Sequence, residues 1–354
     1  MTTTKEDTET ISNPPELAEP GVSERAGWSS WIGAFQGNRE SGFLGRYALL
    51  GVWLLLAAFF GIVKGNLFLT EGTFQTIFGS QQAYIFLGMA AVITFSVGEF
   101  DLSIASLMGF AASLVPILVV NHGWDPATAS VFAVACCAGF GLVNALIIVR
   151  LGIDAIVTSL GMGTLILGLS SKFSNGGTVS GLSSHFAKIS NTDFLLGLPL
   201  SFYYGFALVL MIAYVMRFTA LGRHMAFVGE NREVSRLGGI RVNRIRMGSY
   251  IMSGILCGIG GVILVSGLGG FDSSTSPNFL LPALSATFLG TAAIRPGRFN
   301  ALGTMVAIYF LITGIVGLQL LGYTGWVSEV FYGSALIIAI IISTLARRRA
   351  LGAD

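Results

Sequence analysis

Ten hydrophobic runs dominate this sequence and constrain its fold more than any other feature. Each run is 15 to 23 residues long and is almost free of charged side chains. A helix of about 20 apolar residues crosses a hydrocarbon core of ~30 Å, and inside lipid every backbone polar group must be bonded within the protein. The runs therefore predict an all-α polytopic membrane protein with about ten transmembrane helices. They span residues 47–63, 83–97, 102–120, 127–149, 155–171, 199–216, 247–269, 279–294, 300–321 and 326–345.

Composition supports this class and adds an expectation about helix packing. Only 11% of the residues are charged, against about 25% in a typical soluble domain. The chain has 47 glycines among 354 residues, and small residues let membrane helices approach closely. The run 247–269 contains Gly254, Gly258 and the pair Gly260–Gly261. We expect this glycine face to join helices, either within one chain or between two.

The distribution of basic residues orients the chain in the membrane. With the N-terminus in the cytosol and ten alternating spans, 17 of the 20 basic residues fall in cytosolic segments, and only Lys64, Lys172 and Lys188 fall outside. Cytosolic loops carry an excess of Lys and Arg, so both termini are predicted to be cytosolic. The predicted parts are a flexible tail at 1–45, a permease domain at 46–346 with a cytosolic loop at 217–246, and a basic tail at 347–354.

The cytosolic loop 217–246 is the longest basic segment between hydrophobic runs and carries seven arginines. Within it, GENREVSRLGGI reads as a short helix. Asn231 is the expected N-cap, Glu233 lies in the first turn, and Gly238–Gly239 is the expected stop. Val234 and Leu237 share one face. A helix with so few apolar positions is not stable alone, so it must dock on its own membrane domain or on a partner.

Two carboxylates mark the junction between the second and third runs, in the stretch SVGEFDLSIAS at 96–106. A carboxylate at membrane depth costs at least about 2.5 kcal/mol and normally faces protein or water. Gly98 can break the helix, and Asp101 or Ser103 can cap the next one. One interpretation is a broken helix that lines a translocation route. The other is an interfacial turn in which Glu99 and Asp101 serve only the local helix ends.

Other chemistry is scarce in the sequence. Asn144 and Thr158 are isolated polar residues in or near spans, and they either meet a polar substrate or bond a neighbouring helix. No GxxxxGK[ST] phosphate loop occurs, nor HExxH, GxSxG, CxxC or GxGxxG. The three histidines lie in different loops, which argues against a metal site. The sequence therefore nominates neither a catalytic set nor an ATPase site of its own.

Several segments together resemble a known family: SVGEFDLSIAS, GLVNALIIVRLGI, TSLGMGT, TALGRHMAFVGENREVSRLGGIRV and ALGT. They resemble the permease subunits of bacterial ABC importers for simple sugars, of the ribose, xylose, arabinose and galactose type within the branched-chain amino acid and sugar permease superfamily. The resemblance extends over about 47–343. Glu99 and Ala105 depart from it, because the family usually has glycines at these positions.

The resemblance implies a transport subunit, not an enzyme, in the inner (plasma) membrane of a bacterium. Such a permease translocates a monosaccharide or related polyol that an extracytoplasmic binding protein delivers. It pairs with a second permease copy, identical or similar, and with two cytosolic ATPase subunits. No cofactor is implied in this chain, since ATP and Mg²⁺ are bound by the partner ATPase, and no nucleic acid is involved.

The resemblance also implies roles for individual residues. The cytosolic helix would dock into the ATPase, and the alternative is a helix that lies along the membrane surface. The predicted ATPase-coupling residues are Ala226, Gly229, Glu230, Asn231, Arg232, Glu233, Ser235 and Gly239. The predicted translocation path contains Glu99, Asp101, Ser103, Asn144 and Thr158.

Two other classes of function compete with this interpretation. An ion-coupled secondary transporter or facilitator would need charged residues buried within its spans for coupling, and here the spans are almost free of charge. A membrane-embedded enzyme would need a catalytic set that the sequence does not contain.

Overall fold

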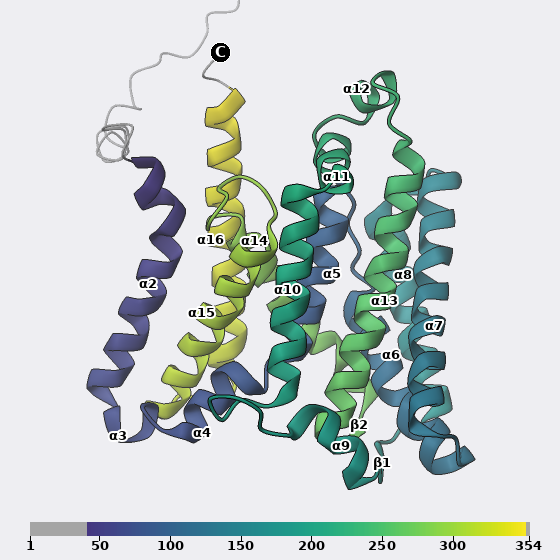
Figure 1. Cartoon of the computed structure of the whole chain (residues 1–354), viewed down its shortest axis with the longest axis vertical. Helices are drawn as coiled ribbons and strands as arrows, with labels where there is room; N and C mark the ends of the chain where they lie inside the picture. The colour runs from purple at the N-terminus through teal and green to yellow at the C-terminus, as the bar shows by residue number, and fades with distance from the viewer. Residues whose placement is uncertain (1–40, 352–354) are drawn as a thin grey trace, which may run out of the picture. The chain divides into compact units, whose positions relative to one another are not determined.

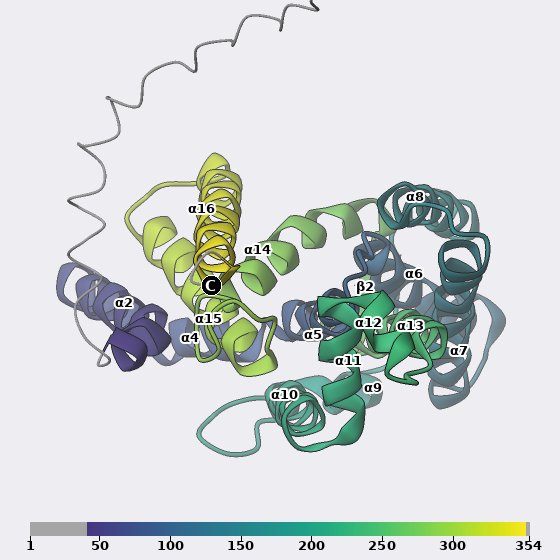
Figure 2. The same ribbon diagram turned by 90° about the horizontal axis from the view of Figure 1, so that it is seen from above.

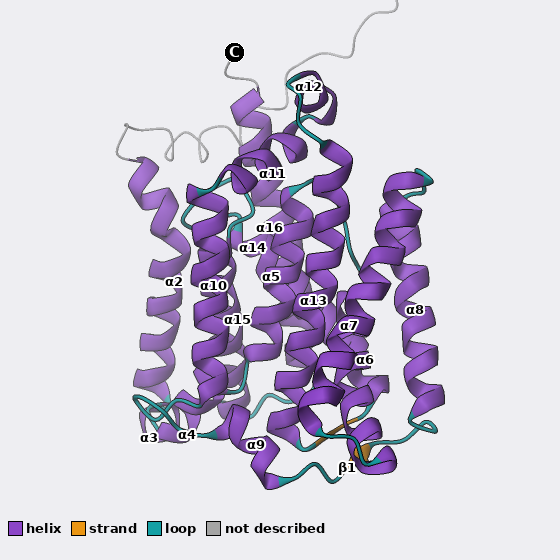
Figure 3. Cartoon of the chain, turned by 45° about the vertical axis from the view of Figure 1, so that its right-hand side comes forward, coloured by secondary structure: helices purple, strands orange, loops and turns teal. Residues whose placement is uncertain are grey.

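Helices account for nearly all of the secondary structure in the computed structural model (Figure 3). The structure describes the backbone of residues 41–351 and the side chains of residues 46–341. The predicted tail at 1–45 lies almost entirely outside the described residues, and so do the side chains of the predicted basic tail at 347–354. Two strands of two residues each, β1 (Val179–Ser180) and β2 (Gly270–Phe271), pair antiparallel within the described part.

The helices follow the predicted hydrophobic runs and add short connecting helices (Figure 1). The first half contains α2 (Ser41–Val63), α3 (Gly65–Phe68), α4 (Glu71–Phe74), η1 (Gln75–Gly79), α5 (Gln82–Ser96), α6 (Ile104–Pro116), η2 (Ile117–Asn121), α7 (Pro126–Ala145), η3 (Leu146–Arg150) and α8 (Ala155–Phe173). The second half contains α9 (Ser184–Asn191), α10 (Leu200–Phe218), α11 (Ala220–Glu230), α12 (Arg232–Leu237), α13 (Val242–Leu268), η4 (Ser273–Phe279), α14 (Leu280–Gly290), α15 (Ala301–Leu320) and α16 (Trp326–Leu351).

The all-α polytopic membrane class is confirmed. Every one of the ten predicted runs is helical, and eight helical segments among the described residues are long and apolar enough to cross a membrane. The two exceptions are α14, which has 11 residues, and α16, whose described apolar part is Trp326–Ile341. The count of ten membrane crossings and the cytosolic position of both termini stay predictions.

The connecting segments separate into two ends of the helical unit Leu44–Asp354. Figure 1 shows α11 and α12 at one end, and α3, α4, α9 and both strands at the other. The loop 217–246, which contains most of the arginines between the spans, therefore lies opposite the segments predicted to be extracytoplasmic. The description below calls the end with α11 and α12 the basic end.

Helix α13 is central to the packing. It contacts α5, α6 and α7, and Figure 2 shows it beside these three helices. A Cβ atom at Gly254 would overlap the carbonyl oxygen of Cys137 on α7, and one at Gly261 would overlap that of Met108 on α6. The predicted glycine face thus joins helices within one chain. Because backbones touch there, α13 is held rigidly against the helices that carry the candidate site.

Candidate coupling and translocation site

The helix is interrupted between α5 and α6 at Gly98, where the sequence allowed a break. Helix α5 ends at Ser96 and α6 begins at Ile104, and the residues between them are irregular. Gly98 has a φ of 72°, a left-handed conformation that residues with a Cβ rarely adopt. The chain therefore turns at Gly98 and runs back into the helical unit as residues 99–103, which we call the broken segment.

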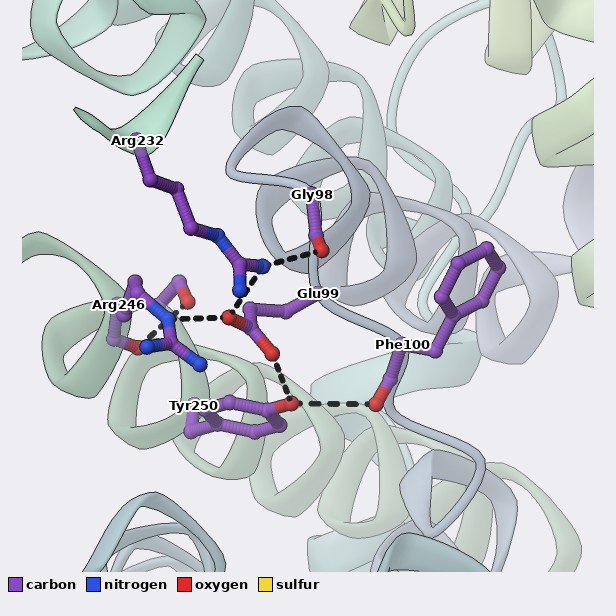
Figure 4. Close-up of polar contacts among 7 residues, drawn as sticks. Gly98, Glu99, Phe100, Arg232, Arg246 and Tyr250 are labelled. Carbon is purple, nitrogen blue, oxygen red and sulfur yellow. Dashed lines mark hydrogen bonds and ion pairs between the residues drawn. The ribbon is translucent and has the colours of Figure 1, made fainter. Parts of the chain in front are cut away.

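Glu99 carries the ion pairs of the broken segment, and its side chain is only 2% exposed. Its Oε1 lies 2.8 Å from Nη2 of Arg232 on α12 and forms a second ion pair with Nε of Arg246 on α13. The hydroxyl of Tyr250 donates to Oε2 at 3.0 Å. Figure 4 shows these groups converging on one carboxylate. Both oxygens are satisfied, which a carboxylate removed from water requires.

Asp101 is completely buried and accepts hydrogen bonds on both oxygens. Oδ1 accepts from the amide of Ser103 at 3.1 Å and from its hydroxyl at 2.6 Å. Oδ2 accepts from the hydroxyl of Ser253 on α13 at 2.9 Å. Ser103 occupies the N-cap position of α6, but its side chain does not accept from a helical amide. The expected cap is therefore not formed, because both side chains are engaged with each other.

Asn144 on α7 joins the same buried cluster. Its Nδ2 donates to the hydroxyl of Ser103 at 3.0 Å, and its Oδ1 is buried without a partner among the described residues. Thr158 on α8 makes no side-chain hydrogen bond in the described structure, although its hydroxyl is buried. The structure thus brings together Asp101, Ser103 and Asn144 and leaves Thr158 outside their hydrogen-bond network. In this conformation the three joined residues are enclosed by protein.

The predicted cytosolic helix exists as α12 (Arg232–Leu237), with the predicted cap. The side chain of Asn231 accepts from the amides of Glu233 at 3.0 Å and Val234 at 3.1 Å. The helix ends at Leu237, just before the glycine pair. Val234 is 62% exposed and Leu237 is 83% exposed. The apolar face of α12 is therefore directed away from the chain's own helices.

Three other predicted coupling residues face inward. A Cβ at Gly229 would overlap the carbonyl oxygen of Ser96, so the end of α11 touches the end of α5 backbone to backbone. Ser235 is buried, with 4% of its surface exposed, and Ala226 is half-buried. These positions fix α11 and α12 against the membrane helices.

The acidic predicted coupling residues lie outward. Glu230 pairs with Arg298 at 2.5 Å and Glu233 pairs with Arg236 at 3.6 Å, and all four side chains are more than half exposed. Exposed pairs of this kind contribute about 0–1 kcal/mol to stability, so they leave the acids available to a partner.

A groove of 380 Å³ lies between α11 and the start of α13, beside α12. Its lining includes the basic side chains of Arg241 and Arg244, together with His224 and the backbone of Gly239. A partner that contacts α12 therefore meets the exposed apolar side chains of α12 and, beside them, a groove lined by arginines.

Sequence reasoning missed the residues of α13 that hold the broken segment. Arg246 and Tyr250 bind Glu99, and Ser253 binds Asp101. Their spacing of four and then three residues places them on one face of a helix. A polar stripe with this spacing on a membrane helix was the available signal.

Comparison with known proteins agrees with the geometry. The family described as branched-chain amino acid transport system / permease component matches residues 74–340. The autoinducer 2 import system permease protein LsrC of Enterobacter sp. (strain 638) is 29% identical over 312 residues, which cover 88% of each chain. The protein of the same name from Yersinia pseudotuberculosis serotype O:1b (strain IP 31758) is 28% identical over 302 residues, 85% of this chain and 84% of the relative. No solved structure matches the chain.

Proposed function

The chain belongs to the permease family of the branched-chain amino acid transport system, and we propose that it is the membrane-spanning subunit of an ATP-driven importer for a monosaccharide or related polyol. A separate cytosolic ATPase supplies the energy and binds ATP and Mg²⁺. An extracytoplasmic binding protein delivers the solute. The membrane is the inner membrane of a bacterium, and a second permease copy, identical or similar, completes the pathway.

The observation that carries this proposal is the arrangement of α12. It is a capped helix at the basic end, with Val234 and Leu237 exposed and with Arg232 bonded to the broken segment behind it. A short helix that exposes its apolar side chains needs a partner to cover them. Docking by an ATPase covers Val234 and Leu237 and brings the ATPase next to Arg232, which bonds to the broken segment.

Translocation requires the buried polar cluster to open. Asp101, Ser103 and Asn144 are enclosed in the described conformation. The buried Oδ1 of Asn144 accepts no hydrogen bond from the described residues. In a conformation where the broken segment moves away from α7, these groups become available to the hydroxyls of a sugar. Thr158 is a further candidate for the same route, from α8.

The solute class is argued from two directions. The polar groups of the cluster are uncharged amides and hydroxyls, apart from Asp101, and these suit a neutral polyhydroxylated molecule. The relatives are named as importing autoinducer 2, so autoinducer 2 is a candidate substrate beside the simple sugars. The binding protein selects among them before the solute reaches this chain.

Reconstitution tests the proposal. The permease is purified in nanodiscs with the ATPase and binding protein from its operon, and ATP hydrolysis is measured with a panel of monosaccharides, polyols and autoinducer 2. We expect stable association and stimulation of hydrolysis by the loaded binding protein. Failure to associate with any ATPase, together with proton- or sodium-driven uptake by the chain alone, would establish a secondary transporter instead.

The substitution Glu233→Arg probes the docking surface. Glu233 is exposed and pairs only with Arg236 in the described structure, so the fold does not depend on it. Charge reversal in the first turn of α12 also opposes the helix dipole, at a cost of about 0.3–1 kcal/mol. We expect about tenfold weaker ATPase association, measured by co-purification and binding in nanodiscs, with only a small decrease in the thermal midpoint of the helical domain. Wild-type association and uptake would remove α12 from the interface.

A further inference from the structure

We propose that Glu99 and Arg232 form the tie that transmits movement of α12 to the broken segment and thereby couples ATP hydrolysis to transport. This inference rests on the proposed function and adds to it the residues that carry the force.

The tie begins with the way α12 is attached to the rest of the chain. Nη2 of Arg232 donates to the carbonyl oxygen of Gly98 at 2.7 Å and to Oε1 of Glu99 at 2.8 Å (Figure 4). Among the residues that the structure describes, these are the side-chain hydrogen bonds and ion pairs that α12 (Arg232–Leu237) makes beyond its own segment. A displacement of α12 therefore pulls first on residues 98 and 99, to which Arg232 is bonded.

Steric contact between two elements transmits a push, whereas an attractive interaction transmits a pull. The backbone at Gly229 touches the end of α5 at Ser96, so α11 can push on this junction by steric contact. Steric contact cannot pull. The charged bond between Arg232 and Glu99 resists separation, and it is strengthened because Glu99 is removed from water. Alternating access needs both directions, and the ion pair supplies the pull that the glycine contact lacks.

The broken segment connects this tie to the buried cluster. Glu99 lies two residues before Asp101, and both are held against one face of α13 by Arg246, Tyr250 and Ser253. Glu99 is therefore shared between α12, which carries the proposed docking surface, and α13, which packs at the centre of the membrane helices. A pull from Arg232 draws the segment along α13 and disturbs the bond between Asp101 and Ser253, which opens the cluster toward Asn144.

A double-mutant cycle in the complete importer tests the tie. The variants are Arg232→Gln, Glu99→Gln and the double substitution, each reconstituted with the ATPase and binding protein in proteoliposomes. Arg150→Gln is the matched control, because it removes one arginine at the end of η3, far along the chain from α12. The readouts are solute transported per ATP hydrolysed, ATPase association and the thermal midpoint.

The tie predicts a specific pattern. Arg232→Gln lowers the solute transported per ATP hydrolysed at least tenfold in complexes isolated with bound ATPase, so a change in docking affinity does not enter this ratio. The double variant is no worse than the poorer single variant, because both substitutions remove one interaction. Arg232→Lys, which keeps the charge, restores at least half of the wild-type ratio. Arg150→Gln behaves as wild type.

Two results would overturn the tie. One is an Arg232→Gln variant whose transport ratio equals that of Arg150→Gln, and the other is single losses that multiply in the double variant. Since Arg232 is 42% exposed, its variants fold even if Glu99→Gln does not. Hydrogen exchange of amides 99–103 gives an independent readout, which we expect to rise on ATP binding in wild type and not in Arg232→Gln. A wild-type complex that fails to bind the ATPase would instead refute the proposed function itself.

Discussion

Replacing Gly229 by leucine is expected to abolish import while the membrane helices remain folded. A Cβ at this position overlaps the carbonyl oxygen of Ser96, and the backbone amide of Gly98 lies 3.5 Å away. Neither backbone group can rotate away as a side chain does, so α11 must move off the end of α5. That displacement separates Arg232 from Glu99 and moves α12 out of register with a docked ATPase.

The expected magnitude is a loss of at least 100-fold in uptake by the reconstituted importer, with ATP hydrolysis reduced far less. The smaller change Gly229→Ala should give an intermediate loss. Gly248→Leu is the matched control, because Gly248 lies near the start of α13, and a Cβ there meets nothing within 4 Å. Import by Gly229→Leu at the level of Gly248→Leu would show that the contact between α11 and α5 has no part in coupling.

The sequence predicted the membrane class because its strongest signal, the long apolar runs, reflects a physical requirement for crossing lipid. An apolar run that crosses lipid must satisfy its backbone hydrogen bonds internally, which a helix does, and the runs at 102–120 and 300–321 correspond closely to α6 with η2 and to α15. The glycine pattern at Gly254 and Gly261 predicted close packing, because residues without a Cβ let membrane helices approach until their backbones touch. The sequence did not show which helices pack against one another, since the apolar faces of different helices are chemically alike.

The local structure of the coupling loop was also predictable. Asn231, Glu233 and the glycine pair are cap, first-turn and stop residues whose preferences are set by backbone hydrogen bonds within a few positions. The structure has the helix with this cap. By contrast, Arg232 and its partner Glu99 lie 133 residues apart in the chain, and no local rule connects them.

The candidate site was predicted in part for the same reason. Gly98 broke the helix as expected, because the left-handed turn is a property of one residue. The expected cap by Asp101 or Ser103 did not form, since tertiary bonds to Ser253 and Asn144 compete for these side chains. Rules based on neighbouring residues treat the N-terminus of α6 as free, whereas the fold brings α7 and α13 to it.

Replacing Asp101 by alanine is expected to cost both stability and transport. The carboxylate accepts three hydrogen bonds, from the amide and hydroxyl of Ser103 and from the hydroxyl of Ser253. Each buried donor left without an acceptor costs about 1–3 kcal/mol, so we expect destabilisation of about 3 kcal/mol and at least a tenfold loss of uptake. The thermal midpoint in nanodiscs and uptake in proteoliposomes measure the two effects.

The variant Asp101→Asn separates the charge of this residue from its hydrogen bonds. Asparagine keeps the size and one carbonyl acceptor, and serine hydroxyls can rotate to accept from its amide. We expect normal assembly with the ATPase and reduced transport, because the carboxylate in the opened cluster is a stronger acceptor than an amide for the hydroxyls of a passing sugar. Asp125→Asn is the control, since Asp125 is exposed and caps α7. Wild-type transport by Asp101→Asn would restrict Asp101 to holding the broken segment against α13, and the translocation route would then have to be sought among Asn144, Thr158 and their neighbours.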